Sequence, residues 1–400
     1  MPKRSVFKNR DSLFPRHIPK TLPHREYYKR MLHDLFEDFL KKPYEVYQRV
    51  VQIIGPVGSG KSCTAFRFGE ELSKKAKDRK IPLKVVHVSC KLGVDSCYML
   101  YQTILQKIAP DMVTRGYSAN EMLRQIVHYL RREGKFLLLT LDDVDYLIRR
   151  SKEEKEEGGI IFDLTRLNEM FFGEYQHVIG VIFIARDASF KKLLDPSEIS
   201  TLGNVVIQMP PYTAEQLHDI LRERVDIAFR RGTVSDEIIE FVADLAASKS
   251  YNPGDCRFAL DILLTSGLIA DAELSEYVTL EHVRKAASES FDGISSEDLM
   301  ALDEHAMLTL IGSARALGFH KTPYVSMKDV YEYYLIACES REIKPLSYSK
   351  VREYIKDLHF RGLLNYNPEK GVSIVGASVE DLSRVLHTIE RRKEFEEEET

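Results

Sequence analysis

Eight consecutive residues near the start of the chain have the types and spacing needed to hold a polyphosphate. The pattern G-x-x-x-x-G-K-[ST] is matched at every position by Gly55, Pro56, Val57, Gly58, Ser59, Gly60, Lys61 and Ser62. Glycines let the backbone curl so that N–H groups face phosphate oxygens, and a following helix adds its positive dipole end. In this pattern the lysine reaches the β- and γ-phosphates and the serine hydroxyl ligates Mg²⁺. The stretch predicts a site for a nucleoside triphosphate with Mg²⁺, lined also by Cys63.

A second acidic site, which such a loop needs for its metal ion, follows the apolar run KFLLLTLDD at residues 135–143. Asp142 is predicted to hold Mg²⁺ through water, beside Ser62. Asp143 is the candidate to orient or deprotonate an attacking water, because a carboxylate at hydrogen-bond distance can do so. For Asp143 and Asp145, a merely solvated strand end is the alternative.

The elements that position these residues can be read from apolar runs between residues 49 and 212. Such runs are typical of parallel strands covered by helices on both faces. They alternate with helical patterns, and they are RVVQIIG, LKVVHVS, KFLLLTLDD, HVIGVIFIAR and NVVIQMP. The pattern predicts an α/β domain with the glycine-rich loop between a strand and a helix. The charge run at 151–159 is expected to be a solvated loop.

After Pro211 the strand patterns stop. Thr213 and Gln216 have the spacing that caps a helix start, and helical patterns continue to about residue 290. From about Ile294, three helical stretches are followed by NYNPEKGVSIVG, two short β-like runs around a turn, which together predict a winged helix. A last helix and a mixed-charge tail end the chain. The predicted domains are 1–212, 213–292 and 293–400.

Composition excludes several classes of protein. The chain has 400 residues, 44% hydrophobic and 30% charged, without an apolar run near the roughly 20 residues of a membrane helix. Five scattered cysteines form no C-x-x-C pair, so zinc or a redox dithiol is not expected. The net charge of −4 requires any DNA-binding surface to be local. The basic first 30 residues, with four prolines and no signal-peptide pattern, predict an extended, unpacked arm and a cytoplasmic location.

Four motifs together resemble a known family. LDDVD at 141–145 resembles the second acidic box of AAA+ ATPases, and LPHRE at 22–26 resembles the adenine-side motif of archaeal replication initiators. These are the single-chain relatives of the eukaryotic origin recognition complex and its helicase-loading partner. The resemblance continues in PPYTAEQLHDILRER at 210–224 and GDCRFALDIL at 254–263, and it covers about residues 18–370.

The resemblance implies an α/β P-loop AAA+ domain, an all-α lid and a C-terminal winged-helix domain, with ATP or ADP between the first two. It implies double-stranded origin DNA as partner, in the nucleoid, with paralogous initiators and a replicative helicase as further candidates. Leu22, Pro23 and Arg25 would lie near the base. Arg257 would be the lid arginine that touches the γ-phosphate, and Arg115 would lie in a helical insertion that touches DNA.

Three departures from the family pattern predict slow hydrolysis. The family usually has Glu where this chain has Asp143, which is one methylene shorter. Arg186 replaces a typical Asn, and Ser197-Glu198 stands where relatives tend to carry an arginine that reaches a neighbouring subunit. Loss of one such charge costs about 10³-fold or more in rate where it is used.

The stretch SYSKVREYIKDLHF predicts a recognition helix. Val351, Tyr354, Ile355 and Leu358 repeat at helical spacing, and burying them leaves Ser349, Arg352 and Lys356 on the outer face, where they can contact a major groove. Asn367 and Lys370 are expected at the tip of the wing, within reach of the DNA backbone. Lys3, Arg4, Lys8 and Arg10 of the arm are further candidates for phosphate contacts.

The sequence is also consistent with other functions. Residues 301–391 carry twelve basic and twelve acidic side chains, so a protein-binding winged helix is an alternative to a DNA-binding one. The nucleotide could be a structural cofactor of a DNA-bound regulator without productive turnover. A P-loop kinase or signalling NTPase is a third possibility, but the sequence shows no acceptor pocket or partner-binding repeats.

Overall fold

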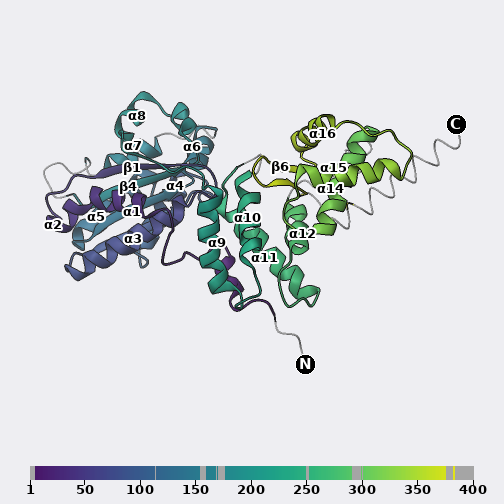
Figure 1. Cartoon of the computed structure of the whole chain (residues 1–400). Coiled ribbons are helices and arrows are strands. Elements are labelled where there is room, and N and C mark those ends of the chain that lie inside the picture. Colours follow the sequence, from purple (N-terminus) through teal and green to yellow (C-terminus); the bar gives the residue numbers. More distant parts are fainter. Residues whose placement is uncertain are drawn as a thin grey trace. The chain divides into compact units, whose positions relative to one another are not determined.

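The computed structural model describes residues 5–112, 114–153, 159–167, 169, 176–248, 252–290, 299, 301–374 and 382, with the side chains of 289 and 290 excepted. The chain divides into two compact units. The sheet unit consists of residues 18–216 and 250–256, and the helical unit consists of residues 1–17, 217–249 and 257–400. The elements are labelled in Figure 1.

The sheet unit contains five parallel strands in the order β2-β3-β4-β1-β5. They are β1 (Arg49–Ile54), β2 (Leu83–Ser89), β3 (Phe136–Asp142), β4 (Val178–Ala185) and β5 (Val206–Gln208). All five apolar runs of the sequence are therefore confirmed as strands. The last residue of β3 pairs with the last of β2, and the last of β1 with the last of β4, so these four strands end at one edge of the sheet. The loops that carry the predicted chemistry begin at this edge.

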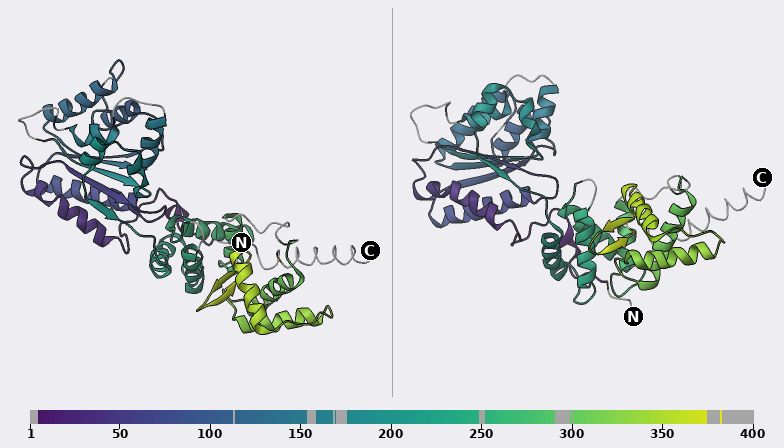
Figure 2. Two further views of the ribbon diagram at one scale, coloured as in Figure 1. Left: turned by 90° about the horizontal axis from the view of Figure 1, so that it is seen from above. Right: turned by 45° about the horizontal axis from the view of Figure 1, so that its top comes forward.

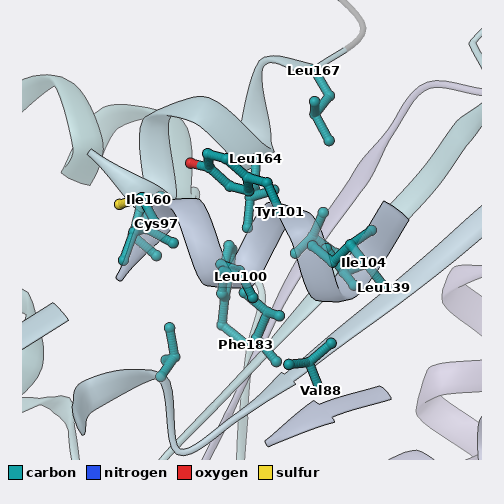
Figure 3. Packing of buried hydrophobic residues seen from close by; sticks show 14 of the residues in the cluster. Val88, Cys97, Leu100, Tyr101, Ile104, Leu139, Ile160, Leu164, Leu167 and Phe183 are labelled. Carbon is teal, nitrogen blue, oxygen red and sulfur yellow. The ribbon is translucent and has the colours of Figure 1, made fainter. Parts of the chain in front are cut away.

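Helices cover both faces of this sheet, as Figure 2 shows. Apolar side chains of α1, α2 and α3, such as Leu32 and Phe68, form the core on one face. Those of α4 to α8 form the core on the other face, where Leu100 and Ile104 of α4 point toward the strands (Figure 3). The bounds are α1 (Glu26–Leu35), α2 (Glu37–Lys41), α3 (Lys61–Asp78), α4 (Cys97–Ile108), α5 (Ala119–Arg132), α6 (Val144–Glu153), α7 (Ile160–Thr165), η3 (Ala188–Leu193) and α8 (Pro196–Leu202).

The helical unit holds a group of four helices followed by a winged helix. Thr213 caps the first helix as predicted, accepting a hydrogen bond from the Gln216 N–H at 3.3 Å while the Gln216 side chain accepts one from the Thr213 N–H. The four helices are α9 (Ala214–Ala228), α10 (Asp236–Ser248), α11 (Cys256–Ala272) and α12 (Leu280–Ser290). In the described residues no helix is long and apolar enough to cross a bilayer.

The predicted winged helix is confirmed. It consists of α14 (Glu304–His320), α15 (Met327–Glu339), α16 (Tyr348–Phe360), β6 (Asn365–Asn367) and β7 (Gly371–Ser373). The strands β6 and β7 pair antiparallel, and Val325 forms a bridge with Val372. The predicted last helix, the tail and the domain boundary at 292/293 lie outside the described residues, as do residues 154–158 of the charge run.

The prediction of an unpacked arm over the first 30 residues is wrong for residues 5–30, since Arg25 is buried, α1 begins at Glu26, and residues 5–17 are packed. Phe7 forms an antiparallel bridge with Phe229, with ring centroids 4.7 Å apart, and Val6 and Leu13 are buried. Arg224 of α9 donates to the carbonyls of Ser12 and His17. Apolar burial and backbone hydrogen bonds therefore fix residues 5–17, which include η1 (Arg10–Leu13), against the rest of the helical unit. Lys8 and Arg10 remain exposed, while Lys3 and Arg4 lie outside the described residues.

Candidate functional site

The glycine-rich loop lies between β1 and α3, as the sequence predicted. Gly58 and Gly60 have φ angles of 72° and 85°, a left-handed conformation that glycine adopts without steric cost. A Cβ atom at Gly58 would lie 1.8 Å from Asp255 Oδ1, and one at Gly60 would lie 2.5 Å from the Tyr212 hydroxyl. The loop therefore needs glycine twice over, for its conformation and for its tight packing against the segments around Tyr212 and Asp255.

Lys61 opens α3 and turns its side chain back into the loop. Its ammonium donates to the carbonyls of Gly55 at 2.7 Å and Pro56 at 2.8 Å, with only 9% of the residue exposed. Burial lowers the pKa of Lys61, and the nearby carboxylates of Asp142 and Asp143 oppose that shift. The loop thus holds a shielded cation at the edge of the sheet where β1 and β3 end.

Asp142 ends β3, and its carboxylate is hydrogen-bonded by Ser62 of α3 and by His87 of β2. Burial alone would raise the pKa of Asp142, but these hydrogen bonds and the charges of His87 and Lys61 together leave the pKa lowered. The carboxylate is therefore ionised near neutral pH. A hydroxyl and a carboxylate that meet beside a lysine are the hard oxygen donors that Mg²⁺ prefers, so the residues fit this ion.

His87 is a neighbour that the sequence did not single out. Its Nε2 lies 3.5 Å from Asp142 Oδ2, and its Nδ1 is buried without a hydrogen-bond partner among the described residues. Nothing in the run LKVVHVS distinguishes this histidine from a side chain that merely packs. Its role depends on the pairing of β2 with β3, which brings it next to a carboxylate more than fifty residues away.

Asp143 directly follows β3 and is held between two cations. Its φ of 56° places a non-glycine residue in the left-handed region. Its Oδ1 lies 3.5 Å from Lys91 Nζ and 3.9 Å from Arg186 Nε. Arg186, which replaces the asparagine typical of the family, therefore lies next to the candidate water-orienting group. Burial and the charge of Asp143 raise the pKa of Asp145, which lies in the first turn of α6.

Arg25, which is predicted to lie near the base, is held by main-chain oxygens and a tyrosine ring. Only 2% of the residue is exposed, and its guanidinium donates to the carbonyls of Ser59 at 2.9 Å and Pro210 at 2.9 Å. Its guanidinium carbon lies 3.7 Å from the centroid of the Tyr212 ring. Main-chain oxygens and a tyrosine therefore engage part of its N–H groups and one face of its guanidinium. The neighbouring Leu22 and Pro23 are half-buried.

Two predicted ligand contacts remain predictions. Arg257 is the second residue of α11 and belongs to the helical unit, whereas the glycine-rich loop belongs to the sheet unit. Arg115 is exposed in the loop between α4 and α5, next to Gly116 with a φ of 91°.

The recognition helix predicted from the sequence corresponds to α16. Val351, Ile355 and Leu358 are buried, and Ser349, Arg352 and Lys356 are exposed, as the helical spacing predicted. Within the described part of the chain, neither Arg352 nor Lys356 forms an ion pair. Their charges are therefore available on the outer face of the helix.

The wing residues are engaged within the protein itself. The Asn367 side chain accepts hydrogen bonds from the backbone N–H groups of Glu369 and Lys370, so it shapes the turn between β6 and β7. The Lys370 ammonium lies 2.7 Å from Glu240 Oε1 and 2.6 Å from Asp244 Oδ2, both on α10. Lys370 thus ties the wing to α10, and its contact with the DNA backbone stays a prediction.

Three family models match the chain in succession. They are an AAA domain over residues 45–194, a Cdc6 AAA+ ATPase-type lid domain over 218–288, and a CDC6 C-terminal winged-helix domain over 297–372. Two curated relatives are 32% identical to it. ORC1-type DNA replication protein 2 of Sulfurisphaera tokodaii aligns over 367 residues, 90% of this chain and 85% of the relative. The ORC1-type DNA replication protein of Desulfurococcus amylolyticus aligns over 359 residues, 90% and 87%.

Solved structures are similar over almost the whole chain. Cdc6p from Pyrobaculum aerophilum, 26% identical, superposes with a TM-score of 0.81 and covers 97% of this chain and 100% of its own. The Aeropyrum pernix ORC1 protein, solved in complex with DNA, is also 26% identical, with a TM-score of 0.63 and coverage of 95% and 96%. The predicted AAA+ domain, helical lid and winged helix are confirmed. The chain belongs to the family of ORC1-type and Cdc6 AAA+ DNA replication proteins.

Proposed function

We propose that this protein is a replication initiator that binds origin duplex DNA through its winged helix and holds ATP or ADP in the glycine-rich loop. The observation that carries this proposal is that one chain contains both a glycine-rich loop beside the carboxylates of Asp142 and Asp143 and a winged helix whose α16 exposes Arg352 and Lys356, neither of which forms an ion pair among the described residues. The DNA complex of the A. pernix relative, 26% identical, supports the DNA-binding part.

The nucleotide part rests on the chemistry of the loop. Lys61 would supply a cation to the phosphates, Ser62 would supply an oxygen ligand to Mg²⁺, and Asp142 would hold the ion through water. When bound, the ion would neutralise charge that develops on the phosphates. Asp143 would orient the water, and Arg257 would respond to loss of the γ-phosphate because a guanidinium can pair with phosphate oxygens at two points. Hydrolysis would then act as a slow conformational switch.

The surroundings of Asp143 support slow turnover. Two cations, Lys91 and Arg186, compete with a water molecule for its carboxylate. The same observation favours a second candidate function, in which the nucleotide is a structural cofactor of a DNA-binding regulator. Retention of ADP through purification, with no change in DNA affinity upon exchange for ATP, would favour this second function.

Turnover by the isolated protein is expected to be below about one ATP per minute, as for NTPases without an arginine finger. Asp143→Glu lengthens the carboxylate by one methylene and should raise the rate, by about tenfold, because the group can reach a water past the two cations. Asp143→Asn should remove the remaining rate. Phosphate release at saturating ATP measures the turnover rates of the wild type and of both variants. Many turnovers per minute by the wild type, or equal rates for all three, would contradict this mechanism.

The wing contact predicts a gain of DNA affinity when it is broken. Asp244→Asn removes the 2.6 Å partner of Lys370 and weakens the hold of α10 on the wing. We expect about three- to tenfold tighter DNA binding and a salt dependence steeper by about one released counterion. Glu273→Gln is the control, since it also removes one negative charge but from a pair with Lys285. Equal effects of both variants would mean that net charge, and not the freed lysine, changed the affinity.

Footprinting on genomic DNA tests the proposed function directly. Protection should concentrate at origin sequences and persist at a higher salt concentration, where phosphate contacts alone weaken. It should be measured with ATP, with ADP and without nucleotide. Recruitment of a replicative helicase and assembly with paralogous initiators belong to the same proposal, and both are tested by co-purification on the protected DNA. Protection spread evenly over all sequences would overturn the initiator function.

A further inference from the structure

Arg25 carries a buried positive charge that the proposed chemistry does not use. Burial lowers its pKa, which means that the fold places a cation where charge is costly. Such a group is tolerated only when its donors are satisfied, and Arg25 donates to three main-chain oxygens, those of His24, Ser59 and Pro210. The face of its guanidinium lies against the Tyr212 ring. Three of its five N–H groups and one face of the guanidinium are therefore engaged by the protein.

The hydrogen bond to Ser59 fixes the direction of one peptide unit in the phosphate loop. In a trans peptide the C=O and the following N–H point in opposite directions. Because the Ser59 carbonyl is held toward Arg25 at 2.9 Å, the Gly60 N–H must point away from Arg25. Gly60 also needs its left-handed φ of 85° for this turn. A loop that binds phosphate through its amides depends on such directions being set before the ligand arrives.

The same guanidinium links the loop to a segment that leads into α9. Pro210 accepts its second hydrogen bond, and the Tyr212 ring that stacks on it has its hydroxyl against Gly60. A separate contact comes from the segment before α11, where the Cys256 N–H donates to the Gly58 carbonyl at 3.3 Å. Two consecutive carbonyls of the loop are thus held from outside, one by a side chain and one by backbone.

We propose that Arg25 is a positioning residue for the phosphate loop, acting through Ser59 and Tyr212, and that it does not recognise the base. This inference rests on the proposed binding of nucleotide by the loop. A positioning role and base recognition predict different ligand dependence. A group that shapes the loop affects every ligand with a polyphosphate, whereas a group that contacts adenine affects only adenine nucleotides.

The test is Arg25→Lys, which keeps the charge but cannot reach two carbonyls while stacking flat on the tyrosine. Displacement of a fluorescent ADP analogue measures the Kd values of ATP, GTP and inorganic tripolyphosphate. For each ligand that the wild type binds, we expect the Kd of Arg25→Lys to be higher than that of the wild type by the same factor, about 10- to 100-fold. Arg67→Ala is the matched control, because Arg67 of α3 also donates to backbone carbonyls, those of Ile18 and Pro19, but not to the loop. It should change each Kd by less than about twofold.

Folding is checked by circular dichroism at the assay temperature, and Tyr212→Leu provides a second variant that keeps the arginine. Tyr212→Leu should raise the same Kd values by a smaller common factor. Loss confined to ATP would show that Arg25 contacts the base, and unchanged Kd values for Arg25→Lys would show that the loop keeps its shape without it. Either result overturns the inference. If none of the three ligands displaces the analogue from the wild type, the proposed nucleotide binding itself is contradicted. This outcome is distinct from failure of the inference about Arg25.

Discussion

Replacing Lys61 with alanine is expected to weaken the binding of both ATP and ADP by about 100-fold or more. The ammonium is shielded by the loop, and charge-assisted hydrogen bonds from a shielded cation to phosphate oxygens are among the strongest in proteins. Loss of Lys61 also removes its hydrogen bonds to the carbonyls of Gly55 and Pro56, of which, among the described residues, only that of Pro56 keeps a donor, Ser59, so the loop becomes less ordered. Isothermal titration calorimetry in the presence of Mg²⁺ measures the effect.

Lys29→Ala is the control for this experiment. Lys29 lies on α1 in the same unit and pairs with Glu71 at 2.8 Å, so its removal also deletes a half-buried lysine and an ion pair. Its effect on nucleotide affinity should be below about twofold. Nucleotide binding by Lys61→Ala at the wild-type affinity would mean that the loop is not the binding site.

Replacing Arg352 and Lys356 together with alanine is expected to weaken binding to a preferred duplex by about 100-fold. Both side chains are exposed on the outer face of α16, and an arginine that contacts a base edge contributes about 1–3 kcal/mol of discrimination. A lysine that contacts a phosphate contributes equally to the affinity for every DNA sequence. The single variants therefore separate the two contributions: Arg352→Ala should relax specificity, and Lys356→Ala should lower the salt slope by about one. Fluorescence anisotropy with specific and scrambled duplexes measures both.

Lys328→Ala is the matched control, because Lys328 is an exposed lysine on α15 of the same winged helix. It should leave specificity unchanged. If Arg352→Ala and Lys356→Ala have neither lower affinity nor an altered salt slope, α16 is not the recognition helix, and a protein-binding winged helix becomes the better interpretation.

Features set by local patterns could be predicted from the sequence. The run KFLLLTLDD specifies both a strand buried on two faces and the carboxylates that follow it, since both depend on neighbouring residues. The same is true of the loop at 55–62 and of α16, where helical spacing alone separates Val351 and Ile355 from Arg352. Parallel strands that end at one edge then bring Asp142 to Ser62 without further information.

Features set by contacts between distant residues could not be predicted. Arg25 meets a carbonyl 185 positions away, and the motif LPHRE carries no sign of that partner. Phe7 lies in a basic segment with too few apolar residues for a periodic pattern, and its packing depends on distant partners such as Phe229. No local pattern around Lys370 indicates that it pairs with two carboxylates of α10. In each case contacts with residues distant in the sequence decide the role.

The central claim is that nucleotide bound in the glycine-rich loop changes the affinity of the winged helix for DNA. One affinity measurement tests this claim most directly. The Kd of the full chain for origin duplex should be determined with Mg²⁺–ATP, with Mg²⁺–ADP and without nucleotide, at fixed salt, with Lys61→Ala in parallel. We predict that the wild-type Kd differs between nucleotide states by at least about threefold and that Lys61→Ala shows no such difference. A wild-type Kd that is the same in all three states would contradict the account.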